Sequence, residues 1–185
     1  MVRRMCLVVI LGVGLAHAAL GANTFLSAEF REIVADSAVV VRGRVTDVRA
    51  ARSAAGDVES VVTIAVDAVL KGAAGPFVSM RVPGGVIGRY RTVMTGAPAM
   101  RVGEQAVFFL KRGPGDTWWP VGLSQGIYRL TAASPRAAPS VRAPVVAGVT
   151  TNASGPVVRG DARRKSMPLP EFESLVRLVV AARTP

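Results

Sequence analysis

Residues 37–49 read SAVVVRGRVTDVR, and residues 58–70 read VESVVTIAVDAVL. From Val41 onward, apolar and polar positions alternate in the first stretch, which is typical of a β-strand with one solvated face. The second stretch alternates in the same way, and residues 51–57 (ARSAAGD) form a polar, flexible connection. Gly43 lies inside the first strand and predicts a bulge or a sharp bend. The two stretches therefore predict a long, bent β-hairpin.

Shorter strands follow this hairpin, each bounded by Gly- or Pro-containing turns. We expect them at residues 76–82, 86–95, 105–110, 118–121 and 126–130. Short strands with such turns are typical of a small sandwich or barrel. The bend at Gly43 favours a barrel, because closure needs strands that curve. The chain is thus predicted to be mainly β, with a small OB-like barrel of five to seven strands.

Helical patterns flank the predicted barrel. In residues 26–35 the apolar positions fall on one helical face, and Ser27 is placed to cap a short helix. Residues 169–183 open with Pro170 and Glu171 and carry a broad apolar stripe, so they predict an amphipathic helix that packs on the barrel. The expected organisation is a signal peptide at 1–22, the barrel domain at 23–131, a Pro/Ala-rich extension with a weak hairpin at 132–168, and this final helix.

The first 22 residues read MVRRMCLVVILGVGLAHAALGA. Two arginines precede an apolar run, and small residues around Ala18 offer a cleavage site, which is the layout of a secretory signal peptide. The alternative is an uncleaved anchor, but the apolar run is shorter than the roughly 20 residues that span a bilayer. We therefore expect export to the periplasm or the outside, with no stable membrane span after cleavage.

This leader contains Cys6 and His17, which are the single cysteine and the single histidine of the chain. After cleavage, the mature chain would have neither side chain. A disulfide, a Ser-His-Asp triad, a cysteine nucleophile and a Cys/His zinc site are then all excluded. We expect no catalytic residues, no metal site and no cofactor, and hence no enzyme.

The chain is basic, with a formal net charge of +11. Removal of Arg3 and Arg4 with the leader leaves 21 basic and 12 acidic side chains, or +9. Such an excess is compatible with an anion-binding surface. The arginines are scattered along the chain, however, and only Arg163-Arg164-Lys165 forms a run, so we favour a compositional origin and do not expect a nucleic-acid partner.

Three segments carry a resemblance to known proteins. They are residues 35–45 (ADSAVVVRGRV), 66–72 (VDAVLKG) and 102–110 (VGEQAVFFL). Together they resemble bacterial exported proteins of unknown function with an OB-like barrel and, more distantly, the netrin-like module of tissue inhibitors of metalloproteinases. The resemblance covers residues 33–131 and implies a fold and a habit of binding. Those inhibitors chelate the zinc of their target through an N-terminal cysteine, which the mature chain lacks, so their mechanism does not transfer.

The adjacent Trp118 and Trp119 are the most suggestive ligand contacts. Neighbours on a strand point to opposite faces, so one ring could lie in the core while the other stacks on a sugar or a side chain of a partner. The favoured alternative is that both rings cover the end of the barrel. The other candidate contacts are Ser124, Gln125, Arg112 and Arg129.

Two functions from different classes follow. The first is an exported, non-catalytic module that binds a protein or an envelope polymer. The alternative is an envelope hydrolase that uses paired carboxylates or a Ser-Lys dyad. Paired carboxylates would have to face each other across a cleft at about 5 to 9.5 Å, and nothing in the spacing pairs any two of them. We therefore favour the binding module.

Overall fold

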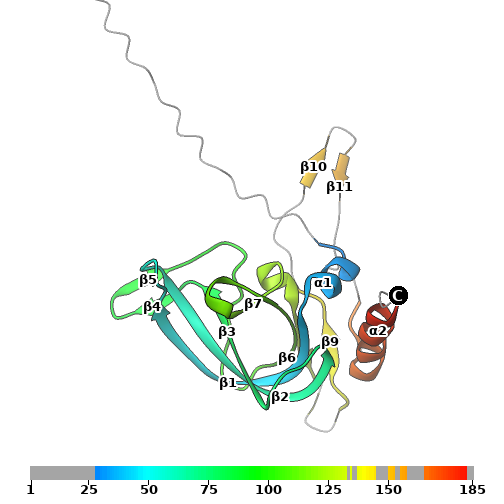
Figure 1. The fold of residues 1–185 in the computed structure, drawn as a ribbon. Coiled ribbons are helices and arrows are strands. Elements are labelled where there is room, and N and C mark those ends of the chain that lie inside the picture. The colour runs from blue at the N-terminus through cyan, green and yellow to red at the C-terminus, as the bar shows by residue number, and fades with distance from the viewer. Residues whose placement is uncertain are drawn as a thin grey trace, which may run out of the picture.

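The fold is taken from a computed structural model that describes residues 28–132, 134, 137–144, 150–152, 155–157 and 165–182. The signal peptide predicted at 1–22 lies outside the described residues. The long hairpin predicted from the sequence is present, and its two strands form one side of a closed barrel (Figure 1).

Five strands close the barrel in the order β1-β2-β3-β7-β6, with β6 pairing back onto β1. The strands are β1 (Val39–Arg52), β2 (Val58–Lys71), β3 (Phe77–Pro83), β6 (Gln105–Arg112) and β7 (Trp118–Pro120). Neighbours are antiparallel except β3 and β7, which are parallel and pair at Met80 and Trp118. The predicted fold class, a mainly β chain with a small OB-like barrel and a helix at each end, is confirmed.

Gly43 marks the bend that closes the barrel. The register between β1 and β2 shifts next to it. A Cβ atom at this position would lie 2.3 Å from the carbonyl oxygen of Ala65 on β2, so the two backbones approach each other at a distance that only glycine permits. The predicted irregularity at Gly43 is confirmed.

Residues 86–95, predicted as one strand, form a small hairpin instead. Its strands are β4 (Gly85–Ile87) and β5 (Tyr90–Thr92). The chain reverses at Gly88, whose φ of +59° is a left-handed conformation that suits glycine. Figure 1 places this hairpin at the end of the barrel away from the helices.

The sheet continues beyond β6 through β8 (Ile127–Thr131), β9 (Ser140–Arg142) and β12 (Met167–Pro168). The surface loop expected over residues 132–147 is therefore interrupted by β9, because Val141 is buried and pairs with Leu130 of β8. The two remaining strands, β10 (Thr150–Asn152) and β11 (Gly155–Val157), form a separate hairpin within the extension.

Helix α1 (Phe30–Asp36) begins later than predicted. Glu29, and not Ser27, is its N-cap residue, and the backbone N–H of Glu29 donates a hydrogen bond of 2.7 Å to Oε2 of Glu32. Helix α2 (Leu169–Ala181) begins at the predicted residue. The short 3-10 turns are η1 (Pro114–Asp116) and η2 (Leu123–Gly126).

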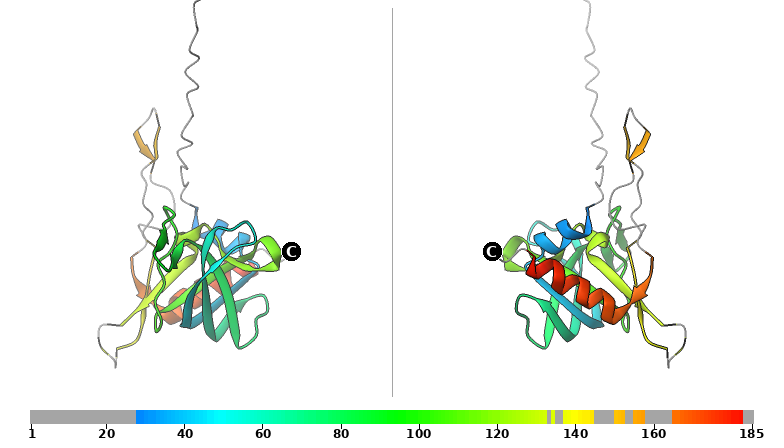
Figure 2. Two further views of the ribbon diagram at one scale, coloured as in Figure 1. Left: turned by 90° about the vertical axis from the view of Figure 1, so that its left-hand side faces the viewer. Right: turned by 90° about the vertical axis from the view of Figure 1, so that its right-hand side faces the viewer.

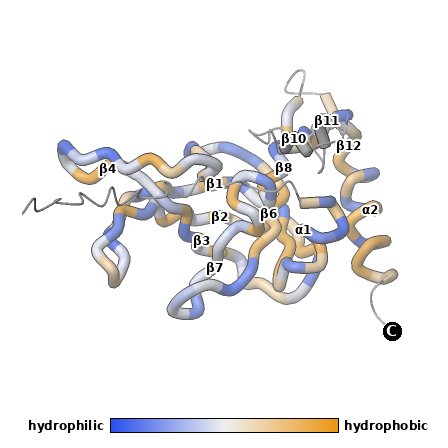
Figure 3. Tube along the Cα trace, turned by 90° about the horizontal axis from the view of Figure 1, so that it is seen from above, coloured by the Kyte–Doolittle hydropathy of each residue, from blue (hydrophilic) through white to orange (hydrophobic). Residues whose placement is uncertain are grey.

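Two apolar clusters hold these elements together. One fills the barrel and includes Val41, Ile64 and Phe108. The other lies outside the barrel wall, beneath α1 and α2, and Figure 2 shows α2 lying across that wall. Because β1 and β6 separate the two clusters, parts of both strands are buried on both faces, and Figure 3 shows hydrophobic residues along β6 and α2.

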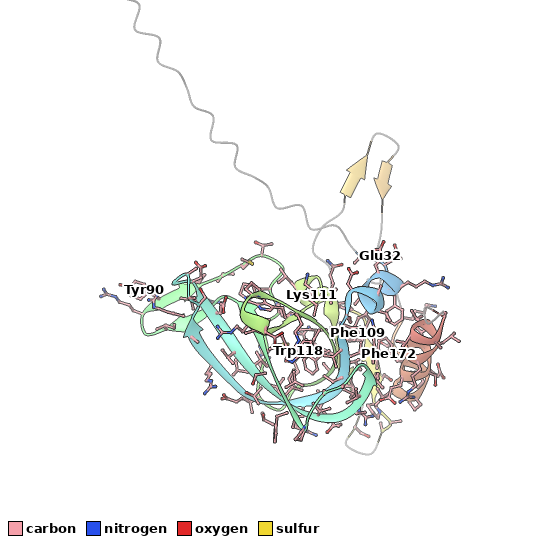
Figure 4. The ribbon with its side chains drawn as sticks, viewed as in Figure 1. Glu32, Tyr90, Phe109, Lys111, Trp118 and Phe172 are labelled. Carbon is pink, nitrogen blue, oxygen red and sulfur yellow. The ribbon has the colours of Figure 1, made fainter. Side chains whose placement is uncertain are left out.

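The outer cluster is centred on four aromatic rings. Their centroids lie between 5.0 Å (Tyr128 to Phe172) and 6.4 Å (Phe109 to Phe172) apart, mostly in tilted or edge-on arrangements. Phe30 of α1 contacts the other three rings. Figure 4 shows Phe109 and Phe172 between the barrel and α2. Tilted and edge-on pairs at these distances add to the stability gained from burial, so both helices are fixed to the barrel through this cluster.

The C-terminal end of α1 and the residue after it are held by Lys71, the last residue of β2. Its Nζ donates hydrogen bonds to the carbonyl oxygens of Val34 (2.7 Å), Ala35 (3.2 Å) and Ser37 (2.5 Å). The final carbonyls of a helix have no intrahelical partner, and a cation near them is favourable. Lys71 therefore ends α1 and ties it to the barrel.

Candidate functional site

The end of the barrel beside β4 and β5 contains two adjacent clefts, of about 680 and 440 Å³. We call the larger the Trp119 cleft; it lies between the start of β2 (residues 57–59), residues 83–84, residues 92–95 and Trp119. The smaller, the hairpin groove, lies between the end of β1, the β4–β5 hairpin and residues 97–100. Both clefts are lined by residues 83–84 and 92–94, so these two segments lie where the clefts adjoin.

Trp119 is held by its neighbours with its ring in a fixed position. Its backbone pairs with Lys111 on β6, and its Nε1 donates a hydrogen bond of 2.8 Å to Oγ1 of Thr117. The ring lies against Gly113, where a Cβ atom would be only 2.1 Å from the Cδ1 atom of the indole. Any larger residue at 113 would displace the ring, and the part of Trp119 that stays accessible lines the cleft.

Trp118 has a different environment. It is half-buried and packs against the cluster inside the barrel. The guanidinium carbon of Arg112 lies 3.7 Å from the centroid of its ring, and Arg112 also forms an ion pair of 3.2 Å with Asp116. A sugar stacking on Trp118 would have to displace this cation. Both tryptophans are half-buried.

Ser124 and Gln125 lie in the turn η2. Gln125 is buried, and its Oε1 accepts a hydrogen bond of 2.7 Å from the backbone N–H of Ala28, just before α1. The backbone N–H of Ser124 donates to the carbonyl of Gly96 at 3.1 Å and so supports the segment beside the clefts. In the structure, both residues make contacts that hold other parts of the chain in place.

Arg129 lies apart from the tryptophans. On β8 it forms an ion pair with Glu104, and its Nη2 donates a hydrogen bond of 2.9 Å to the carbonyl of Ala99. It lines a shallow depression of about 540 Å³ together with Arg101. The structure therefore brings Arg112 and Trp118 together, but it does not gather the six candidate residues into one site, and of these six only Trp119 lines the larger cleft.

Three carboxylates that are mostly buried each form an ion pair with an arginine. Glu59 contacts Arg81 at 2.7 Å on neighbouring strands, and Glu104 pairs with Arg129. The third, Glu173 of α2, lies 3.1 Å from Arg42 of β1. Among the described residues, no three His, Cys, Asp or Glu side chains come together as metal ligands would.

The sequence missed the part played by residues 86–95. Interpreted as one strand, this segment would have joined the barrel wall. The turn at Gly88 turns it back on itself, and the hairpin and the residues after it form walls of both clefts. The signal was the glycine between two short apolar and aromatic stretches, which is also compatible with a hairpin.

No helix within the described part of the chain is both long and apolar enough to cross a bilayer. Comparisons with family models, with curated proteins and with solved structures found no match to this chain.

Proposed function

We propose that this chain is an exported module that binds a protein or an envelope polymer without transforming it. The observation that carries the proposal is the Trp119 cleft. It combines the indole of Trp119, the hydroxyl-bearing Thr92 and Thr95, the apolar Val93 and Met94, and the carboxylates of Asp57 and Glu59 in a space of about 680 Å³. Pockets of this size, with apolar walls and a few polar groups, are typical of binding sites.

The ionisable groups support binding over hydrolysis. A hydrolytic pair of carboxylates needs one group with a proton to give and another that is free to act as a base or nucleophile. Two carboxylates line the cleft, and the mostly buried one, Glu59, is already bound to Arg81. The other, Asp57, is exposed. An amine that activates a serine would need a vacant lone pair, whereas Lys71 donates three hydrogen bonds to backbone carbonyls.

Export is supported by the leader-like pattern at residues 1–22, and a binding role agrees with the resemblance to netrin-like modules. The three segments that carry this resemblance converge in the fold. Val45 of the first segment exchanges backbone hydrogen bonds of 2.8 Å with Gly103 and Glu104 of the third, and Lys71 of the second holds the residues that precede β1. The resemblance itself stays a prediction.

The test is to fill the cleft. The chain carrying Thr95→Trp, the unaltered chain and the control Ala73→Trp would each be immobilised and exposed to envelope extract at modest salt, with mild crosslinking. Ala73 is exposed in the β2–β3 connection, at the opposite end of β2 from the cleft. We expect the unaltered chain and Ala73→Trp to capture the same envelope component, and Thr95→Trp to lose it.

Capture of no component by the unaltered chain, or equal capture by Thr95→Trp, would contradict the proposal. Turnover of an envelope polymer by the purified chain would favour the hydrolase instead. Separate arms with isolated cell-wall polymer and with envelope proteins distinguish the two kinds of partner.

A further inference from the structure

The exposed apolar side chains of the barrel are concentrated in one short segment. Eight large hydrophobic residues are exposed in the described part of the chain, and four of them fall within residues 86–94. These four are Val86 (58% exposed), Tyr90 (56%), Val93 (73%) and Met94 (47%). We call residues 86–94 the hairpin tip. Figure 4 shows Tyr90 at the far end of the molecule from Phe172, and clustering of this kind marks a contact surface.

The apolar groups occur on both faces of the β4–β5 hairpin. Val86 pairs with Arg91, and Ile87 pairs with Tyr90. Paired residues share a face and successive residues alternate, so Val86 and Tyr90 point to opposite sides. A protein seated on one face would leave the other apolar side chain in water. A lipid headgroup layer into which the tip dips would surround both.

The charge of the tip is uniformly positive. Arg89 and Arg91 flank Tyr90, and the guanidinium carbon of Arg89 lies 5.2 Å from the centroid of that ring. Arg91 is exposed, and the described residues offer it no ion pair. No Asp or Glu occurs between residues 68 and 103. Two acidic side chains share a cleft with tip residues: Asp57, which lines a depression with Tyr90 and Arg52, and Glu59, which is bound to Arg81.

From these observations we infer that the hairpin tip docks onto an anionic lipid surface. Val86, Tyr90 and Val93 enter the boundary between headgroups and acyl chains, while Arg89 and Arg91 contact lipid phosphates. Arginine extends its apolar stem along such a surface and keeps its charge at the headgroups, and tyrosine is enriched at that depth. Apolar insertion and attraction of basic residues to anionic lipids reinforce each other.

The geometry permits this docking without rearrangement. The tip lies at the end of the barrel opposite α1 and α2, so the barrel can stand on the surface with its helices away from the lipid (Figure 1). The inference goes beyond the proposed function, because it concerns where the module is held and not what the Trp119 cleft binds. The hairpin tip shares Thr92, Val93 and Met94 with the Trp119 cleft. The variants that test docking are therefore confined to Val86, Arg89, Tyr90 and Arg91, none of which lines that cleft.

The test uses the chain purified after expression from its complete sequence, so that any leader contribution is the same in every variant. Sedimentation with vesicles of equal parts phosphatidylglycerol and phosphatidylcholine is compared with vesicles of phosphatidylcholine alone. We expect binding to the mixed vesicles that falls as salt rises. The double variant Val86→Ser/Tyr90→Ser and the double variant Arg89→Gln/Arg91→Gln should each bind at least about tenfold more weakly.

The matched control is Phe77→Ser/Leu178→Ser. Phe77 (63% exposed) and Leu178 (67%) are as exposed as the tip residues but lie on β3 and α2. This control should sediment like the unaltered chain. All substituted positions are exposed, so unchanged circular dichroism is expected and separates a loss of binding from a loss of fold.

A second measurement reports on the tip directly. A polarity-sensitive dye on Val86→Cys, in a Cys6→Ser background, should shift its emission to the blue with mixed vesicles, while the same dye on Phe77→Cys should not. Equal sedimentation of the tip variants and the unaltered chain, or equal binding to both vesicle types, would overturn the inference. So would a lipid-free dimer that the tip variants abolish, because the tip would then be an interface between two copies.

Discussion

The helix-covered wall of the barrel and the hairpin tip both contain apolar side chains, but they use them differently. Under α1 and α2, rings such as Phe109 and Phe172 are fully buried and contact one another. At the tip, Val86 and Tyr90 remain largely in water. The wall therefore supplies stability, whereas apolar residues at the tip contribute little to the fold. This exposure is the observation on which the proposed contact between the tip and lipid depends.

Removal of one ring from each region should show the largest contrast. Phe109→Ala would leave a cavity at the centre of the aromatic cluster, and we expect the free energy of unfolding to fall by about 3 to 5 kcal/mol. Tyr90→Ala removes an exposed ring and should change it by less than about 0.5 kcal/mol. Urea unfolding of both variants measures the contrast. Equal losses would mean that the tip is part of the cooperative core.

Substitutions of two lysines should differ in their effect on the free energy of unfolding by an intermediate amount. Lys71→Met removes a cation that donates hydrogen bonds to three carbonyls after and within the end of α1, and we expect a loss of about 2 kcal/mol. The control Lys111→Met lies at an exposed position of β6 and should be close to neutral. Thermal unfolding distinguishes them, and a neutral Lys71→Met would show that α1 is held by its apolar face alone.

The smallest predicted effect on the free energy of unfolding concerns two ion pairs, each of which includes an arginine of β1. Arg42, in the half of β1 covered by α2, lies 3.1 Å from Glu173, but Nε of Arg42 and Oε1 of Glu173 find no hydrogen-bond partner in the described structure. Arg49 and Asp47, in the open half, are 3.9 Å apart and exposed. Double-mutant cycles to Ala should give a coupling of about 1 kcal/mol for the covered pair and near zero for the open pair. A larger coupling for the open pair would contradict this order.

Periodicity in the sequence was sufficient to predict the barrel and its flanking helices, but not which part of the barrel wall the helices cover. The alternation in β1 and β2, the bend at Gly43 and the C-terminal helix follow from local patterns, and the structure confirms them. The alternation expected from Val41 onward is confirmed, because Val41, Gly43 and Val45 are buried while Arg44 and Thr46 are exposed. Val39 and Val40, which precede that alternation, are both buried, because α1, directly before β1, and α2, near the end of the described chain, cover the outer face of the wall.

The aromatic cluster and the site depended on contacts that no local pattern contains. Phe30, Phe109, Tyr128 and Phe172 are widely separated in sequence, so their meeting could not be read from spacing. Of the candidate contacts, Arg112 turned out to cover Trp118, and Gln125 to hold Ala28. The two clefts lie where the segment 86–95 turns back on itself. The sequence did not predict them, because it was interpreted as one strand of the barrel wall over these residues.

The parallel seam between β3 and β7 gives the barrel an uneven stiffness. These strands pair at Met80 and Trp118 alone, whereas β1 and β2 pair along nearly their whole length. Resistance to bending and shear in a sheet comes from repeated backbone bonds, so the barrel has one compliant line beside the fixed indole of Trp119. Among the strands of the barrel, we expect amide hydrogen exchange to be fastest along that line.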